Sequence, residues 1–139
     1  MAKILVVNDE ADLVDMTKMI LESEGYEVDA TIDGKRAVTL ARAGAPDIIL
    51  LDFVLSGTNG AEVMRALRAD ELTRSIPVVM MSALRDGELR ARQAGATSFL
   101  AKPFSADTMV DAVRRSIAAP PALNPPDVSG NEGGREGAG

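Results

Sequence analysis

Three short runs of apolar residues punctuate the chain and predict buried strands. Residues 4–7, 48–51 and 78–81 each consist of four consecutive apolar side chains. Runs of this length, rich in branched residues, are typical of parallel strands that are covered on both faces. Two weaker patterns complete the set. Alternation over residues 26–32 predicts a half-exposed strand at a sheet edge, and residues 99–101 predict a short fifth strand.

Helical spacing fills the intervals between these strands. Apolar residues three and four apart indicate five amphipathic helices, and the helix around Leu89 is the weakest. Asn59 and Glu62 stand at capping-box spacing, Ser105 is a good N-cap, and a helix is expected to begin near Asp33. The apolar positions are Leu13, Met16 and Ile20, then Ala37, Val38, Leu40 and Ala41, then Val63, Met64 and Leu67, then Leu89, and finally Met109, Val113 and Ile117.

Alternating strands and helices predict an α/β fold. Five strand–helix units in succession favour a parallel sheet with helices on both faces and right-handed crossovers. This folded unit covers residues 1–118. Residues 119–139 hold four prolines and five glycines. Such a segment buries too little apolar surface to offset its ordering entropy, so a disordered tail is expected there.

Composition removes several classes of chemistry. The chain has no cysteine and no histidine, which excludes disulfides, His- or Cys-ligated zinc and an imidazole base. A net charge of −6 argues against nucleic acid as a partner. No apolar run approaches the roughly 20 residues of a membrane span, and the N-terminus does not resemble a signal peptide. A cytoplasmic location without membrane contact is therefore expected.

Polar residues follow four of the predicted strands. Asn8-Asp9-Glu10 follows the first, Asp52 the third, Ser82 the fourth and Lys102 the fifth. In open α/β sheets, ligands bind at the carboxyl ends of the strands. Two carboxylates and one ammonium group would meet there, and this oxygen-rich set favours Mg²⁺.

This set of side chains predicts phosphoryl chemistry. An aspartate carboxylate can attack phosphorus and form an acyl phosphate. Asp52 is the expected nucleophile because the central strands place it between the other groups. The Ser82 hydroxyl and the Lys102 ammonium group can each bind a phosphoryl oxygen. The donor must be external, since the chain has no histidine.

The sequence resembles the receiver domain of bacterial two-component response regulators over residues 3–118. The resemblance implies a flavodoxin-like, doubly wound, five-stranded sheet of strand order 2-1-3-4-5. The motifs that carry it are residues 4–10 (ILVVNDE), residues 47–52 (DIILLD) with Gly60 eight positions on, residues 77–83 (PVVMMSA) and residues 95–104 (GATSFLAKPF).

The resemblance also implies a role for each site residue. Asp52 is the phosphoacceptor and a Mg²⁺ ligand, together with Asp9 and the backbone carbonyl of Val54. Ser82 is the switch hydroxyl, and Lys102 pairs with the phosphoryl group. Phe99 matches the switch aromatic residue of the family. The Lys102–Pro103 bond is expected to be cis.

The function that follows is that of a signalling phosphoprotein in a phosphorelay. A partner histidine kinase or histidine phosphotransferase would supply the phosphoryl group. The chain would catalyse only its own phosphoryl transfer and hydrolysis, and so would not be an enzyme in the usual sense. Output would be contact with a downstream protein through the fourth helix, fifth strand and last helix, from a monomer or weak dimer.

Three departures from the family pattern bear on this function. Asn8 stands where an acidic residue is usual, so it would reach Mg²⁺ through water and the metal would bind more weakly. Ser56 replaces a common proline, which predicts a more mobile loop. Val54 and Leu84 lie two residues beyond Asp52 and Ser82, where apolar side chains should hinder the hydrolytic water.

Asn8 also supports an alternative, an atypical receiver that binds partners without phosphorylation. Other readings of the same architecture fit less well. A flavodoxin-type site needs a phosphate loop and aromatic residues, and a nucleotide triphosphatase needs a glycine-rich lysine loop that the sequence lacks. A phosphatase of the haloacid-dehalogenase type needs a second aspartate at Val54.

Overall fold

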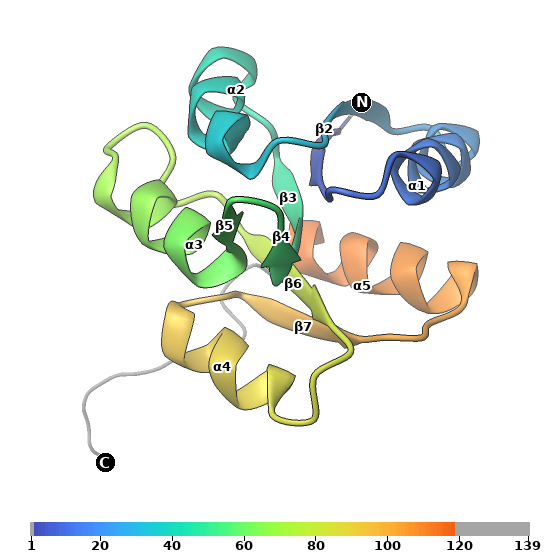
Figure 1. The fold of residues 1–139 in the computed structure, drawn as a ribbon. Coiled ribbons are helices and arrows are strands. Elements are labelled where there is room, and N and C mark those ends of the chain that lie inside the picture. The colour runs from blue at the N-terminus through green and yellow to red at the C-terminus, as the bar shows by residue number, and fades with distance from the viewer. Residues whose placement is uncertain (1, 119–139) are drawn as a thin grey trace.

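A computed structural model describes residues 2–118 and shows a five-stranded parallel sheet (Figure 1). Its strand order is β2-β1-β3-β6-β7, which is the predicted order 2-1-3-4-5 once a small separate hairpin is set aside. The predicted fold class is therefore confirmed. The strands are β1 (Lys3–Val7), β2 (Glu27–Thr31), β3 (Ile48–Asp52), β6 (Val78–Ser82) and β7 (Ser98–Ala101).

Helices cover both faces of the sheet, as a doubly wound fold requires (Figure 1). One cluster of buried apolar residues joins the sheet to α2, α3 and α4, and a second joins it to α1 and α5. The helices are α1 (Ala11–Ser23), α2 (Ala37–Gly44), α3 (Gly60–Ala69), α4 (Gly87–Ala94) and α5 (Ala106–Ala118), with a 3₁₀ turn, η1 (Gly34–Arg36), before α2.

The apolar runs form the central strands because both of their faces are covered. Every residue of β3 and β6 is buried, including the terminal Asp52 and Ser82. The alternation predicted for the edge strand β2 holds in part, because Val28 is buried and Ala30 half-buried, whereas Thr31 is also buried and Ile32 is 56% exposed. Within residues 2–118, no helix is long and apolar enough to cross a bilayer.

The predicted N-cap residues accept helix amides, although the Glu62 carboxylate accepts from the Thr58 hydroxyl at 2.8 Å and the capping box with Asn59 is only half formed. Asn59 Oδ1 accepts a hydrogen bond from the Glu62 amide at 2.9 Å at the start of α3. Ser105 Oγ accepts one from the Thr108 amide at 3.1 Å before α5. Asp33 Oδ1 accepts one from the Lys35 amide at 3.0 Å before η1. Each bond satisfies a helix amide that has no intrahelical partner.

Two expectations about helix faces are wrong. Helix α1 buries Val14, Thr17 and Leu21, whereas Met16 from the predicted stripe is 57% exposed. Two neighbouring rows of residues on α1 have helical spacing. The buried row includes the polar Thr17, so a search for apolar residues alone does not find it. Leu89, the main apolar residue of α4, is also exposed, because this helix packs through Gly87 and Ala91.

A short antiparallel hairpin follows β3 and was not predicted. It pairs β4 (Val54–Leu55) with β5 (Thr58–Asn59) and lies in front of the main sheet in Figure 1. The predicted tail over residues 119–139 lies outside the described residues.

Candidate functional site

Strand register brings the polar strand ends to one edge of the sheet. Asp52 pairs with Met81, the neighbour of Ser82, and Ser82 pairs with Ala101, the neighbour of Lys102. The ladder continues past β7, because the Lys102 amide donates to the Ser82 carbonyl at 2.9 Å. On the other side Val7 pairs with Leu51, so Asn8 follows at the same level as Asp52. The sequence argument from strand ends therefore holds for these residues.

Asp52 and Lys102 form an ion pair inside this edge. Lys102 Nζ lies 2.7 Å from Asp52 Oδ2, although fifty positions separate the two residues in the sequence. The Asp52 side chain is 5% exposed and that of Lys102 is 22% exposed. Within residues 2–118, the one hydrogen bond that the other oxygen, Oδ1, accepts is a long one of 3.4 Å from the Val54 amide. Oδ2 thus accepts a short, charge-assisted hydrogen bond, whereas the hydrogen bond to Oδ1 is long and weak.

Asp9 is tied to the loop that follows the proposed phosphoacceptor. Ser56 Oγ donates a hydrogen bond of 2.8 Å to Asp9 Oδ2. This contact joins the end of β1 to the β4–β5 hairpin. Ser56 stands out in the sequence because it replaces a proline that is common in the family. No local pattern indicated that it would bind Asp9, 47 positions earlier in the chain. The expected mobility of the loop around Ser56 stays a prediction. The hydrogen bond holds one carboxylate oxygen of Asp9 against this loop.

Asn8 is buried, with 2% of its surface exposed. Its Oδ1 accepts a hydrogen bond from the Glu10 amide at 3.0 Å, which shapes the turn into α1. Among residues 2–118 no hydrogen bond uses its Nδ2 as donor, so a buried polar atom is left for water. The contact of Asn8 with Mg²⁺ through water stays a prediction, and Oδ1, the oxygen that would accept from such a water, already accepts the Glu10 amide.

The donor set fits Mg²⁺ chemically. Asp9, Asp52 and the Val54 carbonyl are hard oxygen donors, and Mg²⁺ is usually held by one or two carboxylates with several waters kept. In the described part of the chain, no three Asp or Glu side chains gather closely enough to form a metal site alone.

Ser82 and Phe99 meet the start of α4. Ser82 is 1% exposed, and its Oγ accepts a hydrogen bond from the Leu84 amide at 2.9 Å. A Cβ atom added to Gly87 would lie 2.9 Å from Ser82 Oγ and 3.0 Å from Phe99 Cζ. The two predicted switch residues therefore touch the same turn of α4, and sequence reasoning missed the glycine that permits this close approach. Phe99 is half-buried.

Two apolar side chains flank the site at the surface. Val54 is 57% exposed and Leu84 is 41% exposed. Large exposed apolar residues beside a polar site limit how many waters the rim can hold by hydrogen bonding. The Lys102–Pro103 peptide bond is cis, as the resemblance implied.

Comparisons with known proteins agree on one family. A family model described as "Response regulator receiver domain" matches residues 4–114. The DNA-binding response regulator MtrA of Mycolicibacterium paratuberculosis is 39% identical over 117 residues, which cover 83% of this chain and 51% of MtrA. The response regulator PleD of Caulobacter vibrioides is 42% identical over 118 residues, covering 84% of this chain and 26% of PleD. The chain thus spans about half or less of these relatives.

Solved structures of response regulators have the same fold as this chain. The chemotaxis response regulator CheY4 of Vibrio cholerae superposes with a TM-score of 0.77 at 29% identity, covering 83% of this chain and 98% of CheY4. The receiver domain of the Francisella response regulator 1452 gives a TM-score of 0.78 at 26% identity, covering 85% of this chain and 98% of that domain.

Proposed function

The chain belongs to the response regulator receiver domain family of two-component signalling, and on this premise we propose that it receives a phosphoryl group on Asp52. The observation that carries the proposal is the buried Asp52–Lys102 ion pair at the carboxyl edge of the sheet. A solvated surface carboxylate would need no such partner. Asp9 stands at the same edge, joined to the loop after Asp52 by Ser56.

The transfer is a displacement at phosphorus. An oxygen of the Asp52 carboxylate attacks the phosphorus atom of a phosphohistidine on a partner histidine kinase or histidine phosphotransferase. The bond from phosphorus to the imidazole nitrogen breaks, and the imidazole leaves with the electron pair and takes up a proton. Asp52 Oδ1, with only one long hydrogen bond, is the freer oxygen for this attack.

Lys102 and the acidic residues control charge during the step. The Lys102 ammonium group, now bound to Asp52 Oδ2, is placed to bind an oxygen of the incoming phosphoryl group. Asp9, Asp52 and the Val54 carbonyl would hold Mg²⁺, which neutralises phosphoryl charge and aligns the transfer. Ser56 orients Asp9 for that role through its 2.8 Å bond.

The switch runs through Ser82 and Phe99. Phosphorylation adds roughly −1.5 to −2 charge at Asp52. The Ser82 hydroxyl can donate its proton to a phosphoryl oxygen, which draws it away from the Leu84 amide. Because α4 packs on both Ser82 and Phe99, such a shift moves the start of α4. Output would then be a protein contact that involves α4, β7 and α5.

In this account the protein catalyses only its own phosphorylation and hydrolysis, and it acts on no other substrate. The alternative is a receiver-like module that binds partners without phosphorylation, which the missing acid at Asn8 favours. Beryllofluoride with Mg²⁺ separates the two, because it mimics a phosphoryl group on aspartate. We expect amide NMR signals of Ser82, Phe99 and α4 to shift. Unchanged signals at saturating beryllofluoride would support the alternative.

Replacing Asn8 with aspartate should strengthen Mg²⁺ binding by about tenfold, because it adds a negative charge near the metal. Either oxygen of the new carboxylate can still accept the Glu10 amide, so the turn into α1 is kept. Calorimetric titration of Mg²⁺ into both proteins measures the change. Gln93→Glu adds the same charge on α4 and should leave the affinity unchanged. Equal affinities for the wild type and Asn8→Asp would refute the prediction.

The phosphoryl group should persist for minutes or longer, because Val54 and Leu84 offer water no hydrogen bond at the rim. Val54→Gln supplies an amide that can hold the attacking water and should shorten the lifetime by roughly tenfold. The lifetime is followed by intact mass after the phosphodonor is removed. Leu72→Gln, at a leucine that is 68% exposed and lies outside the site, is the control. Loss of the wild-type label within seconds would contradict this prediction.

A further inference from the structure

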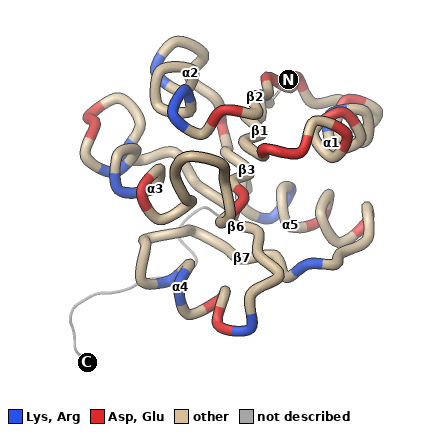
Figure 2. Tube along the Cα trace, in the orientation of Figure 1, with Lys and Arg blue, Asp and Glu red and all other residues tan. Residues whose placement is uncertain are grey.

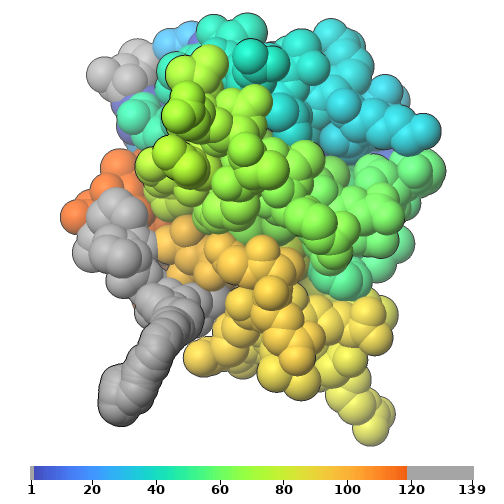
Figure 3. Space-filling model, turned by 90° about the vertical axis from the view of Figure 1, so that its left-hand side faces the viewer, coloured from blue at the N-terminus to red at the C-terminus, as the bar shows by residue number. Residues whose placement is uncertain are grey.

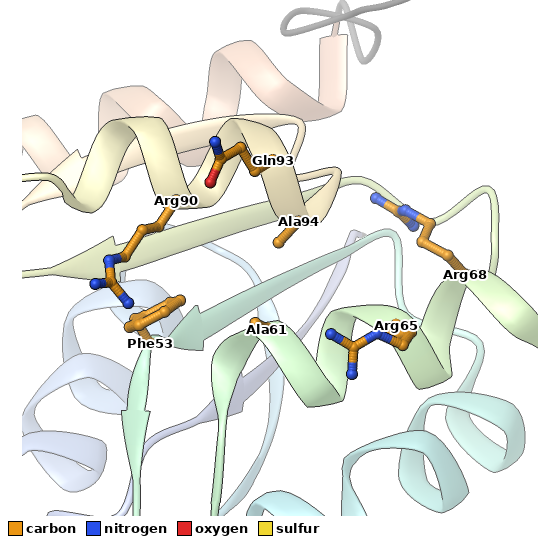
Figure 4. A pocket seen from close by; sticks show the side chains of 7 residues that line it. All are labelled: Phe53, Ala61, Arg65, Arg68, Arg90, Gln93 and Ala94. Carbon is orange, nitrogen blue, oxygen red and sulfur yellow. The ribbon is translucent and has the colours of Figure 1, made fainter.

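Helices α3 and α4 lie side by side on the surface that faces the viewer in Figure 3. Between them is a cavity of about 450 Å³. It is lined by Phe53, Ala61, Arg65, Arg68, Arg90, Gln93 and Ala94 (Figure 4). Three of these seven residues are arginines and none is acidic. The alanines, Ala61 on α3 and Ala94 on α4, leave the space between the helices open.

The protein as a whole is acidic, with a net charge of −6, which makes this local excess of positive charge unusual. Figure 2 shows both basic and acidic residues on α3 and α4, where the acidic ones are Glu62 and Glu88, and a run of acidic residues at the junction of β1 and α1. Among residues 2–118, Arg90 is the one lining arginine with a carboxylate partner, Asp86 at 2.8 Å. Arg65 and Arg68 form no ion pair in that part of the chain.

Two of the guanidinium groups are held in place. Arg68 donates to the carbonyls of Arg74 at 3.0 Å, Ile76 at 2.8 Å and Gly95 at 3.3 Å. Partial burial lowers the pKa of Arg68 through desolvation, with no carboxylate to offset it. The Arg90 guanidinium lies 5.8 Å from the centre of the Phe53 ring, and its bond to Asp86 uses only Nε. The terminal nitrogens of Arg90 remain free to bind an anion.

We propose that this groove between α3 and α4 binds an acidic segment of a partner protein. The positions of the arginines favour a segment over a small anion. Arg90 lies at one end of the groove beside Phe53, and Arg65 and Arg68 lie at the other, with Ala61 and Ala94 between them (Figure 4). Carboxylates spaced along a peptide can contact both ends of the groove at once, which favours a peptide over a single small anion. Arginine suits this role because its planar fork binds carboxylates bidentately.

None of the residues that line the groove takes part in the proposed phosphoryl transfer, although Phe53 directly follows Asp52, so the test is made on the unphosphorylated chain. The probe is a capped hexaglutamate peptide titrated into the unmodified full chain at low salt, followed by amide NMR. We expect shifts centred on Ala61, Arg65, Arg90, Gln93 and Ala94. Raising the salt from about 50 to about 500 mM should weaken binding at least tenfold, since charge carries the affinity. Hexaglutamine should not bind.

Variants locate the site. Arg65→Gln and Arg90→Gln should each weaken binding by roughly fivefold to tenfold. Arg68 is left intact because it also fastens the loop before β6. Arg92→Gln is the matched control, since Arg92 lies on α4, pairs with Glu88 and does not line the groove. Circular dichroism confirms that each variant is folded.

Three outcomes would overturn the proposal. Hexaglutamate could fail to bind, its shifts could map to another surface, or Arg92→Gln could weaken binding as much as the groove variants do. Inorganic phosphate is the comparison probe. If phosphate produced the same shifts at equal affinity, the groove would be a small-anion site and the assignment to a protein segment would be wrong.

Discussion

Asp52→Asn is expected to take up no phosphoryl group from acetyl phosphate and Mg²⁺, whereas the wild type becomes singly phosphorylated. The amide nitrogen is not a nucleophile, and the remaining carbonyl oxygen attacks phosphorus poorly. The amide has nearly the same shape as the carboxylate and can still accept a hydrogen bond from Lys102, so the fold should be kept. Intact-protein mass spectrometry gives the extent of labelling directly.

The matched control for this experiment is Asp15→Asn. Asp15 is an exposed residue of α1, and its replacement changes the net charge by the same amount. It should be phosphorylated as fully as the wild type. Equal labelling of Asp52→Asn and the wild type would show that the acceptor is another residue, and no labelling of any protein would favour the phosphorylation-independent alternative.

Lys102→Met should slow phosphorylation of Asp52 by roughly 100-fold, the typical cost of removing one group that stabilises developing charge. It should also lower the free energy of unfolding by about 1 to 3 kcal/mol, because the buried Asp52 carboxylate loses its partner. The partial exposure of Lys102 keeps this loss below the cost for a fully buried pair. Labelling kinetics and urea unfolding measure the two effects separately.

Two further variants serve as controls for Lys102→Met. Lys18→Met removes an exposed lysine of α1 and should change neither the rate nor the stability. The double variant Asp52→Asn, Lys102→Met should be more stable than Lys102→Met alone, because the amide carries no charge that needs a partner. A Lys102→Met protein that is phosphorylated at the wild-type rate would remove Lys102 from the proposed mechanism.

The sheet and its working edge could be predicted because buried parallel strands have a strong local signal. Continuous apolar runs are rare outside such strands, and the residue that ends each run must lie at the carboxyl edge. Asp52 and Ser82 were therefore placed by their positions directly after the runs at residues 48–51 and 78–81. The strand ends also placed Lys102 at this edge, but the direct ion pair between Asp52 and Lys102 was not predicted, because Lys102 was expected to pair with the phosphoryl group.

Features that depend on tertiary packing escaped prediction. The buried face of α1 includes Thr17. Because threonine is polar, a pattern of apolar residues indicates the neighbouring stripe through Met16, which is exposed. The bond between Ser56 and Asp9 joins residues that no local pattern relates. Gly87 has an ordinary sequence context, and only the packing of α4 on Ser82 and Phe99 shows why a side chain would not fit.

The central claim is that Asp52 carries the phosphoryl group, and peptide mapping tests it most directly. The wild-type protein is treated with acetyl phosphate and Mg²⁺, the acyl phosphate is reduced with borohydride to homoserine, and the modified residue is located by tandem mass spectrometry. The account predicts homoserine at position 52 and at no other aspartate. Homoserine at Asp9 or another residue, or none at all in a protein that remains folded, would contradict it.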